Sequence, residues 1–381
     1  MPPEQDDAIR ARLVDPRATT KTVALFRYLE TVSRRGTLIG QQDPNVTCAD
    51  DDGETDIKRI TGHDPDVWGS DFMHITDANN NGRRHWLTGR LTGEASWYDA
   101  EESAIIQRVV RACEAGNANV FCWHLRDPYR ERTFFASEMP ARHRRRAFRS
   151  LLPGGKKHTW YKRKLEKIAD VLAVAKCADG SLAPIVFRPF HESDADHFWW
   201  GAPYCTATEF RECWSFTVEY LRDTLQVHNV LYAYSLDCTF ETEQQYLERY
   251  PGDAYVDVVG LDDYADFENR RIRAASERLA IVSGYAKRRG KIAALTEVGY
   301  RTQPVPTRLY TDFYGAALSD PSLDIAFLMF WRQKKQRVGG VCFVPPPEGE
   351  AAEDFRTFCK SIRPTTDAGT PCRLTPRRSH T

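Results

Sequence analysis

Eight short apolar segments recur along this chain of 381 residues, and stretches with helical periodicity separate them. They cover 37–42, 66–72, 119–124, 183–190, 230–237, 256–264, 292–297 and 325–331. Each is continuously apolar rather than alternating, which is typical of strands buried on both faces. Repeated strand–helix units of this number predict a single (β/α)8 TIM barrel of the α/β class. An open doubly wound sheet is the alternative, but no glycine-rich phosphate loop follows the first segment.

The segments between the predicted strands carry apolar residues at helical spacing. Predicted helices cover 22–34, 98–113, 159–177, 207–226, 269–288, 307–318 and 352–362. Thr206 and Glu209 have the spacing of a capping box at the start of one of them. We therefore predict one barrel domain over 21–362, with a loose N-terminal arm at 1–20 and a loose C-terminal tail at 363–381.

Charge and hydropathy narrow the possible partners. Lys+Arg and Asp+Glu both number 53, so nothing in the net charge points to nucleic acid or to a membrane surface. No run approaches the roughly 20 apolar residues of a membrane span. The first residues also lack a secretory signal, which predicts a cytoplasmic protein or one whose leader has been removed. We expect a monomer whose ten scattered cysteines are mostly buried free thiols.

Functional residues of such barrels lie at the C-terminal ends of the strands. The residues at or just after these ends are rich in carboxylates, imidazoles and aromatic rings, far beyond what stability requires. The candidates are Gln41, Asp71, His124, Arg188, His191, Glu192, Asp237, Asp262, Tyr264, Glu297 and Trp331. The mouth of the barrel is therefore the predicted site.

Glu192 and Glu297 follow the fourth and seventh predicted strands, which face each other across a barrel mouth. A single Glu at a strand end is usually a solvated loop residue, but two opposed carboxyl groups are the equipment of glycoside hydrolysis. Glu192 is the expected proton donor, and Glu297 would attack or stabilise the anomeric carbon. The cluster of Phe198, Trp199 and Trp200 would form a sugar-binding or supporting wall, although simple packing explains these rings equally well.

A metal site is the competing interpretation of the same strand ends. His124 and His191 could combine with Asp71 or Asp237 as ligands. However, the sequence has no H-x-H or H-E-x-x-H spacing to support such a site. We expect neither a metal ion nor another cofactor.

The segments RPFHE at 188–192 and FWWG at 198–201 resemble the acid/base signature of glycoside hydrolase family 26. That family contains mostly endo-β-1,4-mannanases, with some β-1,3-xylanases and mixed-linkage glucanases. Further matching segments occur in the same order: GQQ at 40–42, TGHDPDVWGSDF at 61–72, CWH at 122–124, LLPGGKKHTWYK at 151–162, VVGLDDY at 258–264, LTEVG at 295–299 and FVPPPEG from 343. The resemblance covers roughly residues 20–362.

This resemblance implies a retaining enzyme in which Glu192 is the acid/base and Glu297 the nucleophile. It also implies a sugar site shaped by Arg188, His191, His124, Tyr264 and Trp331. The implied substrate is a β-linked polysaccharide or oligosaccharide, with mannan ahead of β-1,3-xylan and mixed-linkage glucan. A non-catalytic carbohydrate-binding barrel is a further alternative, which the presence of both glutamates disfavours.

Two features depart from the family pattern or stand outside it. His197 occupies a position where the family carries a Trp near the sugar, so we expect His197 to contact substrate. The long connection at 125–158 is expected to be functional because loops of that length are seldom idle. Its arginines between 142 and 149 suggest a rim for an anionic glycan, although a solvated basic helix is the favoured interpretation.

Overall fold

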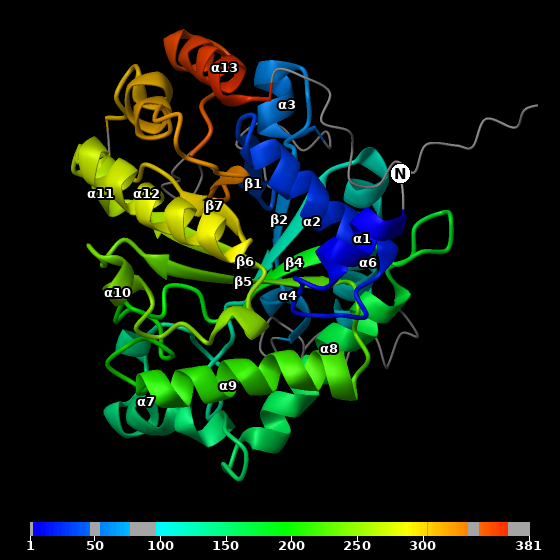
Figure 1. Ribbon diagram of the computed structural model, residues 1–381. Helices are drawn as coiled ribbons and strands as arrows, with labels where there is room; N and C mark the ends of the chain where they lie inside the picture. Colours follow the sequence, from blue (N-terminus) through cyan, green and yellow to red (C-terminus); the bar gives the residue numbers. More distant parts are fainter. Residues whose placement is uncertain (1–2, 46–53, 77–96, 303, 334–342, 365–381) are drawn as a thin grey trace, which may run out of the picture.

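The computed structural model describes residues 3–45, 54–76, 97–302, 304–333 and 343–364. Eight parallel strands close into a barrel in sequence order (Figure 1). They are β1 (Leu38–Gln42), β2 (Val67–Asp71), β3 (Ala118–Cys122), β4 (Ile185–Arg188), β5 (Val230–Asp237), β6 (Val258–Asp263), β7 (Ile292–Val298) and β8 (Phe327–Phe330). The predicted (β/α)8 fold is confirmed, and each predicted strand corresponds to an observed one.

Helices surround this barrel (Figure 1). They are α1 (Pro3–Arg10), α2 (Thr20–Ser33), α3 (Asp56–Thr61), α4 (Met73–Thr76), α6 (Trp97–Ala115), α7 (Ala141–Ala147), α8 (His158–Val174), α9 (Ala207–Glu219), α10 (Glu243–Tyr246), α11 (Ala265–Glu268), α12 (Ile272–Arg289) and α13 (Glu350–Ile362). The predicted helix at 207–226 divides into α9 and a π-helical turn at Tyr220–Thr224, and the one at 307–318 contains a π-helical turn at Tyr310–Gly315. The capping box of Thr206 and Glu209 is present at the start of α9.

The hydrophobic core has two parts. One lies between the strands and the outer helices. The other fills the barrel interior with side chains such as Leu38, Val67, Val120 and Leu231, and it continues into the buried face of α2. Since α2 precedes β1, it covers the end of the barrel where the strands begin. The opposite end, where the strands finish, is left for a site.

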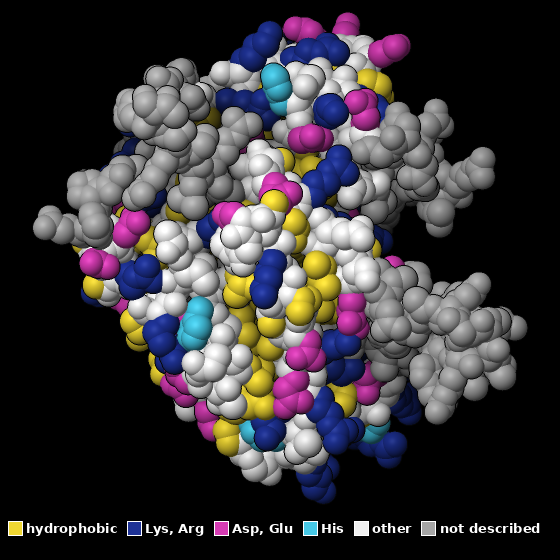
Figure 2. Space-filling model, turned by 90° about the vertical axis from the view of Figure 1, so that its right-hand side faces the viewer, with side chains coloured by type: hydrophobic (Ala, Val, Ile, Leu, Met, Phe, Trp, Pro, Cys, Tyr) yellow, Lys and Arg dark blue, Asp and Glu magenta, His cyan; other side chains and the backbone are white. Residues whose placement is uncertain are grey.

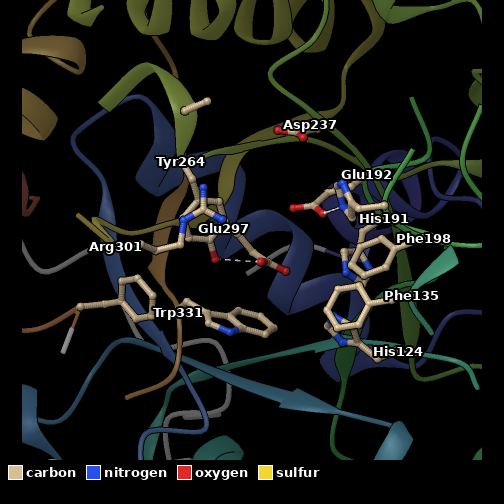
Figure 3. Close-up of a pocket in the computed structure, with 13 residues that line it drawn as sticks. His124, Phe135, His191, Glu192, Phe198, Asp237, Tyr264, Glu297, Arg301 and Trp331 are labelled. Carbon is tan, nitrogen blue, oxygen red and sulfur yellow. Dashed lines mark hydrogen bonds and ion pairs between the residues drawn. The ribbon is translucent and has the colours of Figure 1, made fainter. Parts of the chain in front are cut away.

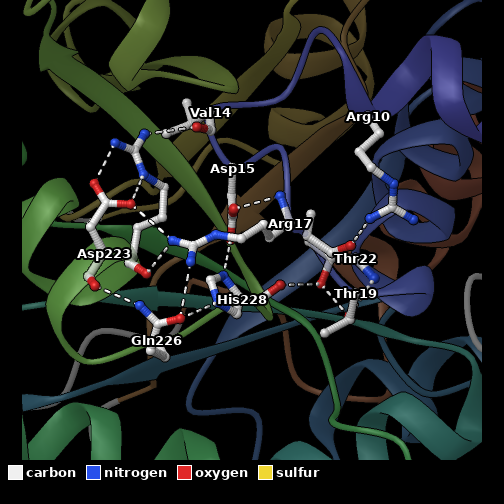
Figure 4. Close-up of polar contacts among 11 residues, drawn as sticks. Arg10, Val14, Asp15, Arg17, Thr19, Thr22, Asp223, Gln226 and His228 are labelled. Atoms are coloured by element: carbon white, nitrogen blue, oxygen red, sulfur yellow. Dashed lines mark hydrogen bonds and ion pairs between the residues drawn. The ribbon is translucent and has the colours of Figure 1, made fainter.

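The N-terminal segment is packed rather than loose, so the predicted arm at 1–20 is wrong for the part that the structure describes. Ile9, Leu13, Val14 and Ala18 are buried in the same core as α2. The amide of Val14 donates to the carboxylate of Asp257 at 2.8 Å, just before β6. A chain of polar contacts continues beside it (Figure 4), including Asp15 Oδ2 with His228 Nδ1 at 2.7 Å. Residues 365–381 of the predicted tail lie outside the described residues.

Replacing Leu13 with alanine should test this packing. We expect the free energy of unfolding to fall by about 2–4 kcal/mol, because a buried leucine loses its contacts and leaves a cavity. Urea unfolding monitored by circular dichroism would measure the change. Arg17→Gln is the matched control, since Arg17 forms an exposed ion pair with Asp223 and such pairs contribute at most about 1 kcal/mol. Equal stability of the Leu13 variant and the parent would show that the segment does not support the barrel.

The structure bears on three features of the sequence: its hydropathy, its charge and its cysteines. Within the described ranges, no helix combines the length and apolarity needed to cross a membrane. On the face shown in Figure 2, acidic and basic side chains are intermixed over much of the surface. Cysteines with described surroundings, such as Cys205, Cys213 and Cys238, are buried and form no disulfide, as predicted.

Candidate active site

A pocket of about 560 Å³ opens at the C-terminal ends of the strands. Its lining includes both predicted glutamates, which point toward one another from opposite sides (Figure 3). The other lining residues are His124, Phe135, His191, His197, Phe198, Asp237, Tyr264, Ala265, Arg301, Trp331 and Phe343. The strand ends therefore bring the two candidate carboxyl groups into one cavity.

Glu192 reaches the pocket through an unusual turn after β4. Phe190 and Glu192 adopt φ angles of 51° and 53°, in the left-handed region that residues with a β-carbon seldom occupy. The amide of Glu192 donates to the carbonyl of Ser235 on β5 at 3.0 Å, which fixes the turn against the next strand. Unfavourable backbone conformations of this kind are held by their surroundings and cluster at functional sites.

A β-bulge positions Glu297. Leu261 pairs with Leu295 and Asp262 pairs with Glu297, so Thr296 is an extra residue on β7. The hydroxyl of Thr296 donates to the carboxylate of Asp262 at 2.5 Å and lies 3.1 Å from the carbonyl of Leu261. Bulges bend a strand and redirect its side chains. This bulge therefore helps to set the direction of Glu297 at the end of β7.

Arg188 supports the nucleophile candidate from below the pocket. Its guanidinium is fully buried and forms ion pairs with Glu297 Oε1 and Asp262 Oδ2. The hydroxyl of Tyr264 donates to the other oxygen of Glu297 at 3.0 Å. Both oxygens of Glu297 are thus engaged by donors, and these contacts favour its ionised form. Arg188 contacts carboxylates and is absent from the described pocket lining, so it would shape the site through Glu297 and Asp262.

The two glutamates differ in how firmly they hold a proton. Burial raises the pKa of Glu192 well above its usual range, and the negative charges of Asp262 and Asp237 raise it further. Burial also raises the pKa of Glu297, to about 8, although the positive charge of Arg188 opposes the increase. Negative charge on Glu297 is therefore favoured by its contacts with Arg188 and Tyr264 and opposed by its burial.

Three carboxyl groups meet at this point: oxygens of Glu192, Asp262 and Glu297 lie within 4.8 Å of one another. Such a cluster could attract a cation. Arg188 already contacts two of the three carboxylates, so a metal ion bound by all three would have to compete with a buried guanidinium. A second group of possible ligands, formed by Asp71, Cys122 and His124, lies beside the pocket.

In that second group, Asp71 orients His124. Its Oδ1 accepts the backbone amide of His124 at 3.1 Å, and its Oδ2 lies 2.7 Å from the ring nitrogen Nδ1. Burial would raise the pKa of Asp71, but the interactions with His124 outweigh it and lower the pKa to about 2. Asp71 is therefore placed as a support behind a pocket residue, and its predicted part in the sugar site stays a prediction.

Aromatic rings and His191 form one side of the pocket. The rings of His124 and His191 lie 4.6 Å apart, and those of His124 and Trp331 lie 5.7 Å apart. Burial lowers the pKa of His191 well below its usual value, and Arg188 lowers it further, which favours a neutral imidazole. Flat rings around a cavity can accept the C–H faces of sugars, while the imidazole can exchange hydrogen bonds with hydroxyl groups.

Two predicted tryptophans belong to the supporting wall and do not line the pocket. Trp199 and Trp200 are fully buried, and their indole N–H groups donate to the carbonyls of Leu125 at 2.9 Å and His191 at 2.7 Å. Of the two roles that the sequence left open for this cluster, the buried position of both tryptophans favours support, while Phe198 lines the cavity. Gln41 is also fully buried and absent from the described lining, so its predicted part in the site stays a prediction.

Some lining residues were not expected to contact sugar. Asp237 was a strand-end candidate and a possible metal ligand in the sequence, and it lines the pocket. Arg301 follows β7, where its guanidinium pairs with Glu268 at 2.9 Å and lies over the Tyr264 ring at 4.8 Å. Phe135 comes from the long connection after β3 and is 40% exposed. No local pattern distinguishes Arg301 or Phe135 from other loop residues.

The arginine-rich part of that connection lies elsewhere. None of its arginines belongs to the described lining of the pocket. Arg144 donates to the carbonyl of Ala136 at 3.1 Å and lies over the ring of Tyr204, while Arg149 pairs with Glu209 at 2.5 Å. This placement favours a solvated basic helix over a rim for an anionic glycan.

Known proteins are similar to this chain in sequence and architecture. The chain is 33% identical over 341 residues to a mannan endo-1,4-beta-mannosidase of Bifidobacterium adolescentis. The aligned region covers 83% of this chain but only 31% of that protein. The structure of GH26C from Muricauda sp. has a TM-score of 0.88 and 40% identity, covering 97% of this chain and 98% of that one. An endo-beta-1,4-mannanase double mutant of Cellulomonas fimi has a TM-score of 0.78 and 31% identity, with coverage of 91% and 75%.

The family model for glycosyl hydrolase family 26 matches residues 14–293. This match covers more than half of the chain and includes seven of the eight strands in whole or, for β7, at its first residues. The resemblance seen in the sequence motifs is thus confirmed independently of the site geometry. The chain belongs to glycosyl hydrolase family 26.

Proposed function

We propose that this protein is a retaining glycoside hydrolase that cleaves β-1,4-mannan internally. The observation that carries the proposal is the pair of carboxyl groups facing each other in one pocket, with oxygens of Glu192 and Glu297 within 4.8 Å. Retaining enzymes have carboxyl groups about 5–5.5 Å apart, whereas inverting enzymes need roughly 6.5–9.5 Å to admit a water molecule. The short separation supports direct attack by a carboxylate.

In the first step, Glu192 gives its proton to the glycosidic oxygen as the bond to the anomeric carbon breaks. Glu297 attacks that carbon from the opposite side and forms a covalent glycosyl ester. Arg188 and Tyr264 keep Glu297 ionised and oriented before attack. As its charge is transferred into the new bond, the guanidinium remains paired with Asp262.

In the second step, Glu192 is a carboxylate and accepts a proton from an incoming water molecule. The resulting hydroxide attacks the anomeric carbon, breaks the ester to Glu297 and restores both side chains to their starting states. The two inversions leave the β-configuration unchanged. His124, His191 and Trp331 would hold the sugar ring while both steps occur at the same carbon.

The choice of mannan is supported by the related proteins rather than by a contact in the pocket. The Bifidobacterium and Cellulomonas relatives are named as mannan-degrading enzymes. β-1,3-Xylan and mixed-linkage β-glucan are the alternative polymers for the same mechanism. His197 at the pocket rim is a position at which such a preference could be altered.

A substrate panel read by proton NMR would test the proposal. We expect cleavage of mannan and galactomannan into several oligosaccharides, and the reducing end formed first should be the β-anomer because two inversions preserve configuration. Xylans and lichenan should be cleaved much more slowly. An α-anomer formed first would refute the retaining mechanism, and preferential cleavage of xylan or lichenan would refute the choice of mannan.

A further inference from the structure

One side chain touches the carboxyl group of Glu192 in the described part of the molecule. Nε2 of His197 contacts Oε2 of Glu192 and can form both a hydrogen bond and an ion pair with it. His197 lines the pocket, and its side chain is 34% exposed compared with 10% for Glu192. The contact therefore lies at the rim, between the candidate proton donor and solvent.

The backbone around His197 is held in place. Its carbonyl accepts the amide of Ala136 at 2.8 Å, which joins this turn to the connection after β3. Its ring meets the edge of Phe198 at 4.2 Å between centroids. On the other side, Asp194 accepts the amide of Asp237 at 2.8 Å and ties the same turn to the end of β5. The imidazole thus approaches Glu192 from a segment anchored at both flanks.

The two glutamates are supported in different ways. Glu297 has a donor on each oxygen, Arg188 on Oε1 and Tyr264 on Oε2. Glu192 has one such contact, at Oε2, and its remaining oxygen points into the cavity (Figure 3). A proton donor must present its acidic oxygen to the leaving group. Because His197 contacts only Oε2 of Glu192, Oε1 is the oxygen that can present the proton to the leaving group.

Apart from His197, the cations near the carboxyl group of Glu192 are already paired with other acids. The other charged and titratable groups around it are His124, Arg188, His191, Asp194, Asp237, Asp262, Tyr264, Glu297 and Arg301. Four of these are acids, and the two arginines are already paired, Arg188 with Asp262 and Glu297 and Arg301 with Glu268. In such an environment, a hydrogen-bond donor in direct contact with Glu192 strongly influences the proton on its carboxyl group.

We propose that His197 is a positioning residue for the proton donor: its Nε2–H donates to Oε2 of Glu192 and keeps the transferable proton on Oε1, facing the pocket. This role rests on the proposed glycosidase function and specifies how its acid is oriented. Before bond cleavage, His197 directs the proton toward the glycosidic oxygen. After cleavage, the same N–H stabilises the carboxylate that must accept a proton from water.

His197→Phe and His197→Gln form a matched pair for a test. Phenylalanine keeps a ring but removes the donor, whereas glutamine keeps an N–H donor at a similar distance from the backbone. Carbon-13 NMR of protein labelled at the glutamate side-chain carboxyl would follow Glu192 directly, with Glu192→Gln identifying its signal. We expect the titration midpoint of Glu192 to rise by about 1 pH unit in the Phe variant, because its carboxylate loses a donor, and to stay near the parent value in the Gln variant.

Kinetics supply an independent result. The Phe variant should lose about 10- to 100-fold in kcat/KM on mannooligosaccharides, whose leaving groups need a proton. It should lose little on a dinitrophenyl glycoside, whose leaving group does not need one. The Gln variant should recover most of the rate on mannooligosaccharides. If His197 had a merely structural role, the Phe variant would instead lose kcat/KM equally on both substrates.

These measurements separate the inference from the proposed function. An unchanged midpoint of Glu192 in the Phe variant, or equal losses on both substrates, would overturn the role of His197 even in an active mannanase. If the parent cleaves no β-glycan but the midpoint still rises in the Phe variant, the proposed hydrolase function fails and the link between His197 and Glu192 stands.

Discussion

Replacing Glu297 with alanine should abolish turnover on every substrate, including glycosides with excellent leaving groups. We expect kcat to fall by on the order of 10⁴-fold or more, because without the carboxylate no covalent intermediate can form. Measuring release of dinitrophenol from an activated glycoside provides the most demanding assay. A rate close to that of the parent would refute the proposed nucleophile and the double displacement with it.

The control for this variant must address folding. Glu297 shares Arg188 with Asp262, so its removal leaves a buried guanidinium with one carboxylate partner instead of two. Loss of a partner from a buried ion pair can cost about 3–5 kcal/mol. Glu297→Gln keeps the side-chain volume and a hydrogen-bond acceptor for Tyr264. Both variants should be inactive, and a folded, inactive Gln variant would assign the loss to chemistry rather than to unfolding.

Replacing Glu192 with alanine should give a different kinetic pattern. On mannan we expect a loss of about 10²–10⁴-fold, the usual contribution of a positioned general acid. On a dinitrophenyl glycoside the first step should remain fast, because that leaving group departs without a proton. The intermediate should then accumulate, since no carboxylate activates water. Added azide should accelerate turnover and yield a β-glycosyl azide, because azide attacks without a general base.

Asp196→Ala is the matched control for Glu192→Ala. Asp196 is an exposed acid in the same turn, so its removal changes the local charge without touching the pocket carboxyl groups. The Asp196→Ala variant should cleave both substrates at the rate of the parent and should show no new response to azide. Equal losses of Glu192→Ala on mannan and on the activated glycoside, or the absence of azide rescue, would show that Glu192 is not the acid/base.

The barrel was predictable because its signal is spread over the whole sequence. Eight apolar runs with helices between them leave few arrangements that bury every strand. Once the strands are placed, their C-terminal ends point to Glu192 and Glu297 without further information. The site could therefore be located from periodicity and residue type, and the family motifs pointed to the same residues.

The fine structure of the site was not predictable because it depends on contacts between distant segments. Nothing in the sequence around Thr296 signals that it is the extra residue of a bulge against β6. The positive φ of Glu192 likewise depends on its bond to Ser235. Trp199 and Trp200 look like sugar platforms by type, but the carbonyls that accept their N–H groups come from Leu125 and His191.

The polar N-terminal segment was misjudged for the same reason, and its docking has a consequence for how the chain folds. Val14 and Asp257 are 243 residues apart in the chain, yet one hydrogen bond joins them beneath the barrel. During synthesis, the ribosome must add all the residues from Val14 to Asp257 before this contact can form. Contacts of such long sequence separation carry a large loop-closure cost and slow folding. The segment can pack against α2 early, but its attachment to the strand that carries Asp257 has to wait until β6 emerges, an interval in which a nascent-chain chaperone would have a target to protect.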